Sequence, residues 1–148
     1  MKMRVEETLD VRKRLREAVV FYETAGKVAM IKEIDNLNGQ FAGDGCYLFA
    51  VDLEGNMLAH PMDKFKGRNL MDLRDSLGKS FIRKIVDTAK ARGGGSTEYE
   101  WPMPGGEIEG RKTTLFERVG DFVLCCGFFS SDEPSLESHY ERLFGPLE

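Results

Sequence analysis

Three cysteines and two histidines are the side chains of this 148-residue chain best suited to nucleophilic or metal chemistry. Cys125 and Cys126 are adjacent in an apolar run. On a strand, neighbouring side chains point to opposite faces, so this pair cannot chelate one ion without a bulge. His60 and His139 are far apart, and no motif supports a nucleophilic pair of Cys46 with His60. We therefore predict no metal site and no cofactor.

Motifs of enzymes and nucleic-acid binders are also missing from the sequence. The glycine run at 93–95 lacks the Lys-Ser/Thr pair of a phosphate-binding loop, and no nucleophile elbow occurs. The net charge of −4 argues against a nucleic-acid partner, because phosphates require a concentrated basic face. We predict that the protein is not an enzyme and binds no nucleic acid.

The composition is that of an ordinary globular protein, with 41% hydrophobic and 31% charged residues. A chain of this length suits one compact domain. No segment approaches the roughly 18 apolar residues that span a bilayer, and residues 1–16 are too polar for a signal peptide. We therefore expect a soluble chain. A cytoplasmic location agrees with these features, although flanking segments could have been lost from the chain.

The start of the chain, residues 6–35, is predicted to be helical. Apolar residues recur at three-to-four spacing with charged residues between them, as in a long amphipathic helix. Gly26 is a suitable C-terminal cap for that helix. The apolar stripe of Val28, Ile31 and Ile34 then predicts a second, short helix.

The rest of the chain alternates apolar segments with turns rich in Gly, Pro and Asn, as antiparallel strands do. The predicted strands are 46–51, 57–60, 96–101, 111–118 and 122–129, with a helix at 81–89 and another after residue 131. We predict one domain over 1–148, with N-terminal helices at 6–35, a sheet core at 39–130 and a C-terminal helical tail at 131–148. Its fold class is α+β: a PAS-like five-stranded antiparallel sheet with a long N-terminal helix and helices on one side.

Aromatic residues gather on the predicted strands at alternating positions. Alternation places Tyr47 and Phe49 on one face of their strand, and Tyr99 and Trp101 together on another. Such a group can line an aromatic pocket, or it can be ordinary core. His60, at a strand end, could face a ligand and change charge near neutral pH, or it could cap a loop carbonyl.

Four short segments of the sequence resemble the single Cache domain family of bacterial receptors. They occur in the same order as in that family and with similar spacing. They are FAVDLEGNMLAHP at 49–61, GRNL at 67–70, GQF at 39–41 and YEWPMP at 99–104. The likeness extends from about Ala18 to Phe129. It implies the ligand-sensing part of a chemoreceptor or sensor kinase, usually outside the membrane, and several members recognise small carboxylates. It therefore adds an extracytoplasmic location as the alternative to a cytoplasmic one.

The resemblance also implies which polar side chains could bind a carboxylate. Lys112 matches the family's usual lysine position, and Thr114 lies two residues on, hence on the same face of the strand. Arg68 is a second candidate cation, in a loop that could cover the pocket. From the residues alone, Lys112 would be read as solvent-facing. Leu115 and Phe129 stand where tyrosines are common in the family, so we expect a smaller or more apolar ligand.

The leading hypothesis is a ligand-binding sensory domain for signal transduction or chemotaxis that recognises a small metabolite, most simply an organic acid. The predicted ligand-binding residues are Tyr47, Phe49, His60, Arg68, Tyr99, Trp101, Lys112 and Thr114. The alternative is a protein-interaction or dimerisation module with the same fold and no small-molecule ligand. A homodimer through the N-terminal helix and a signalling output partner are further expectations.

Overall fold

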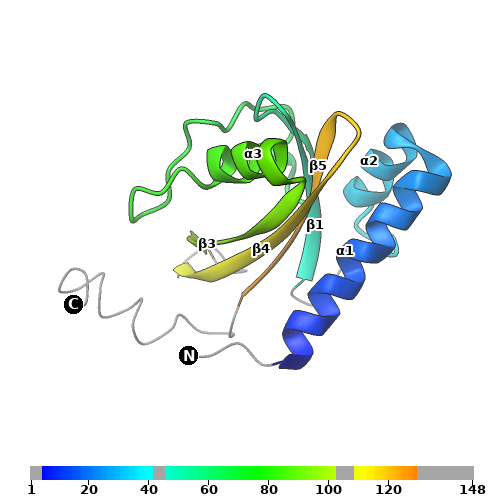
Figure 1. Ribbon diagram of the computed structural model, residues 1–148, viewed down its shortest axis with the longest axis horizontal. Helices are drawn as coiled ribbons and strands as arrows, with labels where there is room; N and C mark the ends of the chain where they lie inside the picture. The colour runs from blue at the N-terminus through cyan, green and yellow to red at the C-terminus, as the bar shows by residue number, and fades with distance from the viewer. Residues whose placement is uncertain (1–4, 42–45, 103–108, 130–148) are drawn as a thin grey trace.

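The computed structural model describes residues 5–41, 46–102 and 109–129 (Figure 1). The helices are α1 (Val5–Ala25), α2 (Lys27–Asp35), the short 3-10 helix η1 (Asp63–Phe65) and α3 (Phe81–Arg92). The strands are β1 (Cys46–Asp52), β2 (Met57–Ala59), β3 (Gly94–Pro102), β4 (Glu109–Val119) and β5 (Phe122–Phe129). They form one antiparallel sheet in the order β2-β1-β5-β4-β3. The five-stranded antiparallel sheet and the long N-terminal helix are therefore confirmed.

Glycines with positive φ angles end two of the helices. At Gly26 (φ 90°) the N–H donates to the Tyr22 carbonyl over 2.8 Å, and the Gly26 carbonyl then accepts the Met30 N–H of α2. At Gly93 (φ 85°) the N–H donates to the Ala89 carbonyl over 2.9 Å. Glycine adopts a positive φ without a steric penalty, which explains why both helices end at these positions.

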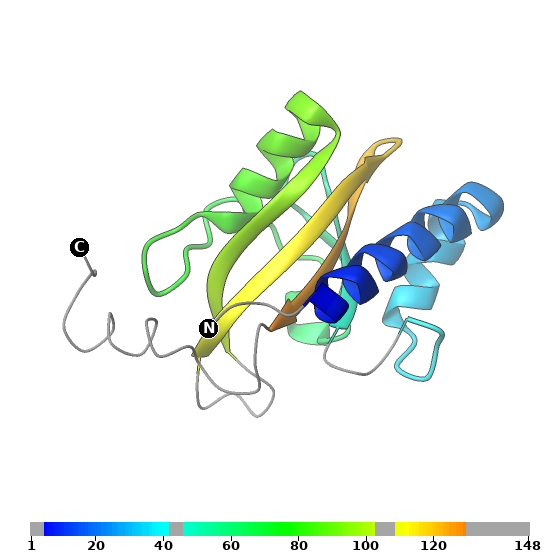
Figure 2. The same ribbon diagram turned by 60° about the horizontal axis from the view of Figure 1, so that its bottom comes forward.

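The helices lie on both faces of the sheet, with α1 and α2 on one side and α3 on the other (Figures 1 and 2). The sequence prediction had placed them on one side. The reason for the difference is the central strands: β1 and β5 carry buried residues at consecutive positions, without a break from Phe122 to Phe128. A sheet that is apolar on both faces must be covered on both.

Each face has its own apolar core, and residue alternation along the strands divides them. The core that we call the α1 face includes Val11, Leu15, Ala18, Leu48, Ala50, Leu124, Cys126 and Phe128. The core that we call the α3 face includes Phe49, Val51, Phe81, Ile82, Ile85, Tyr99, Phe116 and Cys125. Adjacent residues of one strand thus belong to different cores.

The short helix α2 agrees only in part with the apolar stripe predicted from the sequence. On α2, Met30 and Ile34 are buried, whereas Val28 is 69% exposed and takes no part in the apolar stripe.

No helix in the described ranges is long and apolar enough to cross a membrane. The predicted tail at 131–148, with His139, lies outside the described residues, so the proposed division of the domain stays a prediction.

Candidate functional site

The predicted aromatic residues and Lys112 meet on the α3 face of the sheet. Tyr99 on β3 is the register partner of Lys112 on β4, so both side chains leave the sheet on the same side. Tyr47 and Phe49 come from β1, on the far side of β5. Strand alternation therefore grouped the aromatic residues correctly, and the sheet order brings the two groups together.

Lys112 crosses β5 to reach the aromatic residues of β1, and Gly127 makes that crossing possible. A Cβ atom at Gly127 would overlap Cε of Lys112 and lie 3.1 Å from both Nζ of Lys112 and Oγ1 of Thr114. The missing side chain thus leaves a channel across the sheet face for the lysine stem. Beyond it, Nζ of Lys112 donates a hydrogen bond to the hydroxyl of Tyr47.

The side chain of Lys112 is held in the interior, where four rings surround its amine. Nζ lies 4.2, 5.0, 5.3 and 5.6 Å from the ring centroids of Tyr47, Phe49, Trp101 and Tyr99. The residue is only 1% exposed, so the solvent-facing interpretation is excluded. Within the described ranges, no Asp or Glu side chain forms an ion pair with it. Burial lowers the pKa of Lys112 to about 7.

Two hydroxyl groups on this face bond to each other. The Tyr99 hydroxyl and Oγ1 of Thr114 are 2.7 Å apart, and both residues are buried. Thr114 thus lies on the same face as Lys112, as predicted, and its hydroxyl orients Tyr99. Burial raises the pKa of Tyr47 and of Tyr99 well above the ordinary phenol value, so both remain protonated hydrogen-bond donors.

His60 packs inside the same cluster, with ring centroids 5.0 to 5.7 Å from those of Tyr47, Phe49 and Phe65. Its Nδ1 accepts the N–H of Met62 over 2.9 Å. Burial lowers the pKa of His60 to about 3, with the charge of Lys112 acting in the same direction. The ring is therefore neutral at physiological pH, and a change of charge near neutral pH is not expected of it.

The loop after β2 and the start of α3 supply two rings that the sequence analysis did not assign to the site. Phe65 of η1 lies 5.2 Å from Trp101, and Phe81 stacks on Tyr99 at 4.0 Å and 7°. Phe65 and Trp101 are partly exposed, so the cluster reaches the surface here. Arg68 is in the same loop but exposed, and none of the described aromatic contacts involves it.

Leu115 does not belong to the site, and this corrects an expectation from the sequence. It packs against the α1 face, because it lies three positions after Lys112 along β4 and an odd offset puts it on the opposite face of the strand. It therefore removes no hydroxyl from the neighbourhood of the lysine. Phe129 is the register partner of Lys112 on β5 and does share its face. Only this second position supports the argument for a more apolar site.

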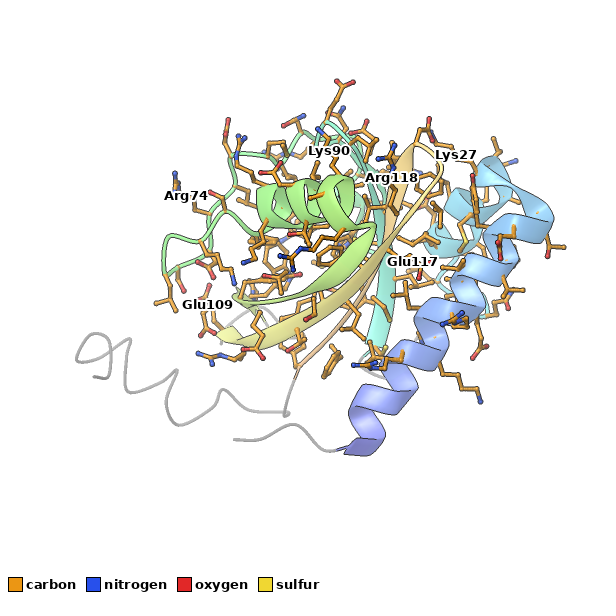
Figure 3. All side chains as sticks on the ribbon, viewed as in Figure 1. Lys27, Arg74, Lys90, Glu109, Glu117 and Arg118 are labelled. Atoms are coloured by element: carbon orange, nitrogen blue, oxygen red, sulfur yellow. The ribbon has the colours of Figure 1, made fainter. Side chains whose placement is uncertain are left out.

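The result is an aromatic cluster around a single buried amine, and the cluster includes two phenol groups and one imidazole. Exposed cations such as Arg74 and Lys90 lie at the outside of the molecule (Figure 3). The described residues contain no group of three or more His, Cys, Asp or Glu side chains placed to hold a metal ion. The cluster thus combines apolar ring surface with one buried amine, and sites for small molecules are built from this combination of groups.

The chain is also similar in sequence to a known domain family and to a sensor kinase. A family model described as single Cache domain 2 matches residues 23–132. The sensor histidine kinase MctS of Rhizobium johnstonii is 42% identical over 65 residues, which make up 43% of this chain and 14% of the kinase. The matched region is thus a small part of that relative.

Solved structures of chemosensory proteins share the fold. A Cache chemosensory domain studied for carboxylic acid recognition has a TM-score of 0.70 and 24% identity, covering 85% of this chain and 92% of its own. A methyl-accepting chemotaxis protein from Vibrio parahaemolyticus has a TM-score of 0.66 and 22% identity, covering 86% and 94%. A periplasmic sensor domain of a chemotaxis protein has a TM-score of 0.64 and 22% identity, covering 82% and 89%.

Proposed function

This chain belongs to the single Cache domain family of sensory modules, and we propose that it binds a small carboxylate on the α3 face, with Lys112 as the group that recognises the anion. One observation carries the proposal: a buried lysine surrounded by aromatic rings, with no carboxylate paired to it in the described ranges. Domains of this family are sensory and typically have no enzymatic activity, and this agrees with the lack of catalytic motifs in the sequence.

The energetic argument starts from the cost of an isolated charge. Removing an ammonium group from water costs several kcal/mol unless an opposite charge or strong hydrogen bonds replace the solvent. Each ring of the cluster returns only about 0.5 to 2 kcal/mol through cation–π attraction. The rings do not fully offset the cost of removing the ammonium group from water, and the pKa of Lys112 is lowered as a result. A carboxylate ligand would supply the missing charge, and its binding would restore the proton on Lys112.

The aromatic walls define which acids fit. Phe49 and Phe81 offer apolar surface, whereas the hydroxyl of Tyr47 can donate to a ligand oxygen next to Nζ of Lys112. A short acid with a small apolar tail satisfies both requirements. Trp101 and Phe65 border the exposed side and are the side chains that the acid would pass.

A signal from this cluster must reach the N-terminal helices or another output element. His60 provides a direct connection, because its backbone N–H donates to the Asp35 carboxylate over 3.3 Å at the end of α2. Lys66, next to Phe65, forms an ion pair with the same carboxylate. We therefore propose that α2 and α1 respond to the ligand. Homodimerisation through α1, where Val20 is 52% exposed, is part of the same proposal.

A thermal-shift screen with short monocarboxylates and matched uncharged amides tests this function. A ligand at 100 times its Kd stabilises the folded protein by about 2.7 kcal/mol. We expect stabilisation by the acids and not by the amides. The alternative of a protein-interaction module predicts no response to any compound.

Substitution of Lys112 by Met tests the role of the amine while keeping the volume of its stem. We expect Lys112→Met to lose the acid-induced shift, while the protein without added ligand keeps or gains stability, because a buried charge is replaced by an apolar group. Lys90→Met, at an exposed position of α3, is the matched control and should respond like the wild type. An undiminished shift in Lys112→Met would remove this residue from the site.

A further inference from the structure

The nitrogen that is proposed to recognise a carboxylate is also placed to react with a carbonyl group. We propose that Nζ of Lys112 forms a reversible covalent imine with a small 2-oxo acid, so that this class of acid is held by a bond as well as by charge. The inference rests on the proposed function, because the acid must enter the same aromatic cluster. It adds a ligand class and a modification site to that function.

The surroundings of Lys112 differ from those of the other lysines with described partners. Lys27 is paired with Asp121 and Lys66 with Asp35, and Nζ of Lys79 donates to the backbone carbonyl of Glu98. Lys112 instead faces four rings and the phenol of Tyr47, and it is 1% exposed. This environment favours the neutral amine, which is the nucleophilic form.

The fraction of Lys112 that is neutral can be compared with the neutral fraction of an unperturbed lysine. With its pKa lowered to about 7, about half of Lys112 is neutral at neutral pH. For an unperturbed lysine the neutral fraction is on the order of one in a thousand. The amine of Lys112 is therefore more reactive toward carbonyl compounds than an unperturbed lysine amine, provided that the ligand reaches it.

The reaction needs one proton from the solution and no other reagent, because a neutral amine becomes a protonated imine. The Nζ lone pair forms a bond to the carbonyl carbon, the carbonyl π electrons move to oxygen, and a proton moves from nitrogen to that oxygen to give a carbinolamine. The carbon–oxygen bond then breaks, the hydroxyl leaves as water with one added proton, and a carbon–nitrogen double bond forms. Tyr47, hydrogen-bonded to Nζ, is placed to relay that proton from water and is protonated again in the same step.

A 2-oxo acid fits this product better than a simple aldehyde does. The protonated imine keeps a positive charge at the centre of the same four rings, where cation–π attraction stabilises it. The adjacent carboxylate of the ligand then neutralises this charge within the adduct itself. No second protein cation is needed, which matches a cluster where Arg68 is exposed and Arg111 is paired with Glu98 and Glu100.

Borohydride trapping tests the imine on the whole chain. The protein is incubated with pyruvate, a small 2-oxo acid, or with acetate or lactate, then reduced with borohydride and analysed by intact mass and peptide mapping. We expect one adduct with pyruvate only, equal in mass to the acid less one oxygen, located at Lys112. Labelling at Lys112 should exceed that at exposed Lys90 by at least about tenfold, because the aromatic cluster would hold the acid next to Nζ of Lys112. The mapping uses the wild-type chain, so it does not depend on the folding of any variant.

The outcomes separate the two proposals. If acetate and pyruvate both stabilise the protein but no adduct is trapped, the imine is wrong and carboxylate binding stands. If pyruvate labels surface lysines as strongly as Lys112, the imine proposal is also overturned. If no acid stabilises the protein and nothing is trapped, both proposals fail. Lys112→Met should remove the adduct, whereas Lys90→Met should leave it unchanged.

Discussion

The two faces of the sheet are built from the same strands but differ in chemistry. The α1 face is filled mainly with apolar side chains, including the rings of Phe41, Phe122 and Phe128, and with the thiols of Cys46 and Cys126, whose sulfur atoms are 3.2 Å apart. The α3 face carries the aromatic cluster, the buried amine of Lys112 and the neutral ring of His60. Close packing of mainly apolar side chains suits a structural role, and a buried amine inside an aromatic cluster suits binding.

Adjacent residues of one strand therefore have different roles. On β5, Cys126 contacts the α1 face while Cys125 lies in the α3 face, and burial raises the pKa of the Cys125 thiol. Substitutions on the α1 face should affect stability alone. Substitutions around Lys112 should affect ligand binding more than stability. The following predictions can contradict or refine this separation.

The largest effect is expected from Leu124→Ala on the α1 face. Leu124 is fully buried, and removing a buried leucine side chain costs about 2 to 5 kcal/mol of the free energy of unfolding. Urea unfolding measures this loss, and Val20→Ala, at an exposed position of α1, is the control expected to change stability by less than about 0.5 kcal/mol. The affinity of the folded protein for a carboxylate should remain that of the wild type. A large loss of affinity would show that the two faces are not separate.

Gly127→Ala should affect both stability and binding, because its new methyl group overlaps the stem of Lys112. Overpacking of this kind costs about 1 to 3 kcal/mol, and displacement of the amine should also abolish acid binding. The control is a double-mutant cycle with Lys112→Ala, which removes the overlapping atoms. In that background Gly127→Ala should cost little, and an undiminished cost would place the strain elsewhere.

The pH dependence of stability isolates the charge of Lys112. Its pKa is about 7 in the folded protein and 10.5 as the ordinary value, so above pH 7 the unfolded chain binds more protons than the folded one. The free energy of unfolding should therefore rise with pH, by about 1.5 kcal/mol between about pH 7 and 8.5, before thiol ionisation in the unfolded chain opposes it. The difference between wild type and Lys112→Met in urea unfolding measures this contribution. If the free energy of unfolding of the wild type and of Lys112→Met depended on pH in the same way, the lowered pKa of Lys112 would be contradicted.

Carboxylate affinity should change in the opposite direction over the same pH range. The anion binds the protonated amine, so affinity should fall above about pH 7, by up to about tenfold per pH unit. The neighbouring titratable groups, His60, Tyr47, Tyr99 and Cys125, keep their neutral forms in this range because burial shifts their pKa values away from it. Calorimetric titration at several pH values measures the affinity.

The parts of this comparison that follow from local pattern could be predicted from the sequence. Period-two alternation grouped Tyr47 with Phe49 and Tyr99 with Trp101, and helical periodicity located α1 and α3. The inclusion of Lys112 came from family resemblance, since a lysine on a strand gives no local sign of burial. The same resemblance misassigned Leu115, where the parity of its distance from Lys112 would have shown the opposite face.

The remaining features depend on contacts between distant segments. The role of Gly127 requires the pairing of β4 with β5, which places it beneath the lysine stem. Phe65 joins the cluster only because its loop folds back over Trp101. Single-sequence periodicity contains no information on strand order or on loop closure, so neither role could be predicted.

The smallest effect on stability is expected where the two sides of the molecule are connected. Asp35, at the end of α2, accepts the backbone N–H of His60 and pairs with Lys66, a partly exposed ion pair that is worth less than about 1 kcal/mol. Asp35→Asn keeps the acceptor oxygen and removes the charge. We expect nearly unchanged stability and carboxylate affinity, but a weaker ligand-induced slowing of amide hydrogen exchange in α2, measured by mass spectrometry. Asp121→Asn is the matched control, because it removes the ion pair of Lys27 at the other end of α2 and should leave that response intact. An equal response in Asp35→Asn would mean that the signal leaves the cluster by another route, such as the contacts of β1 with α2.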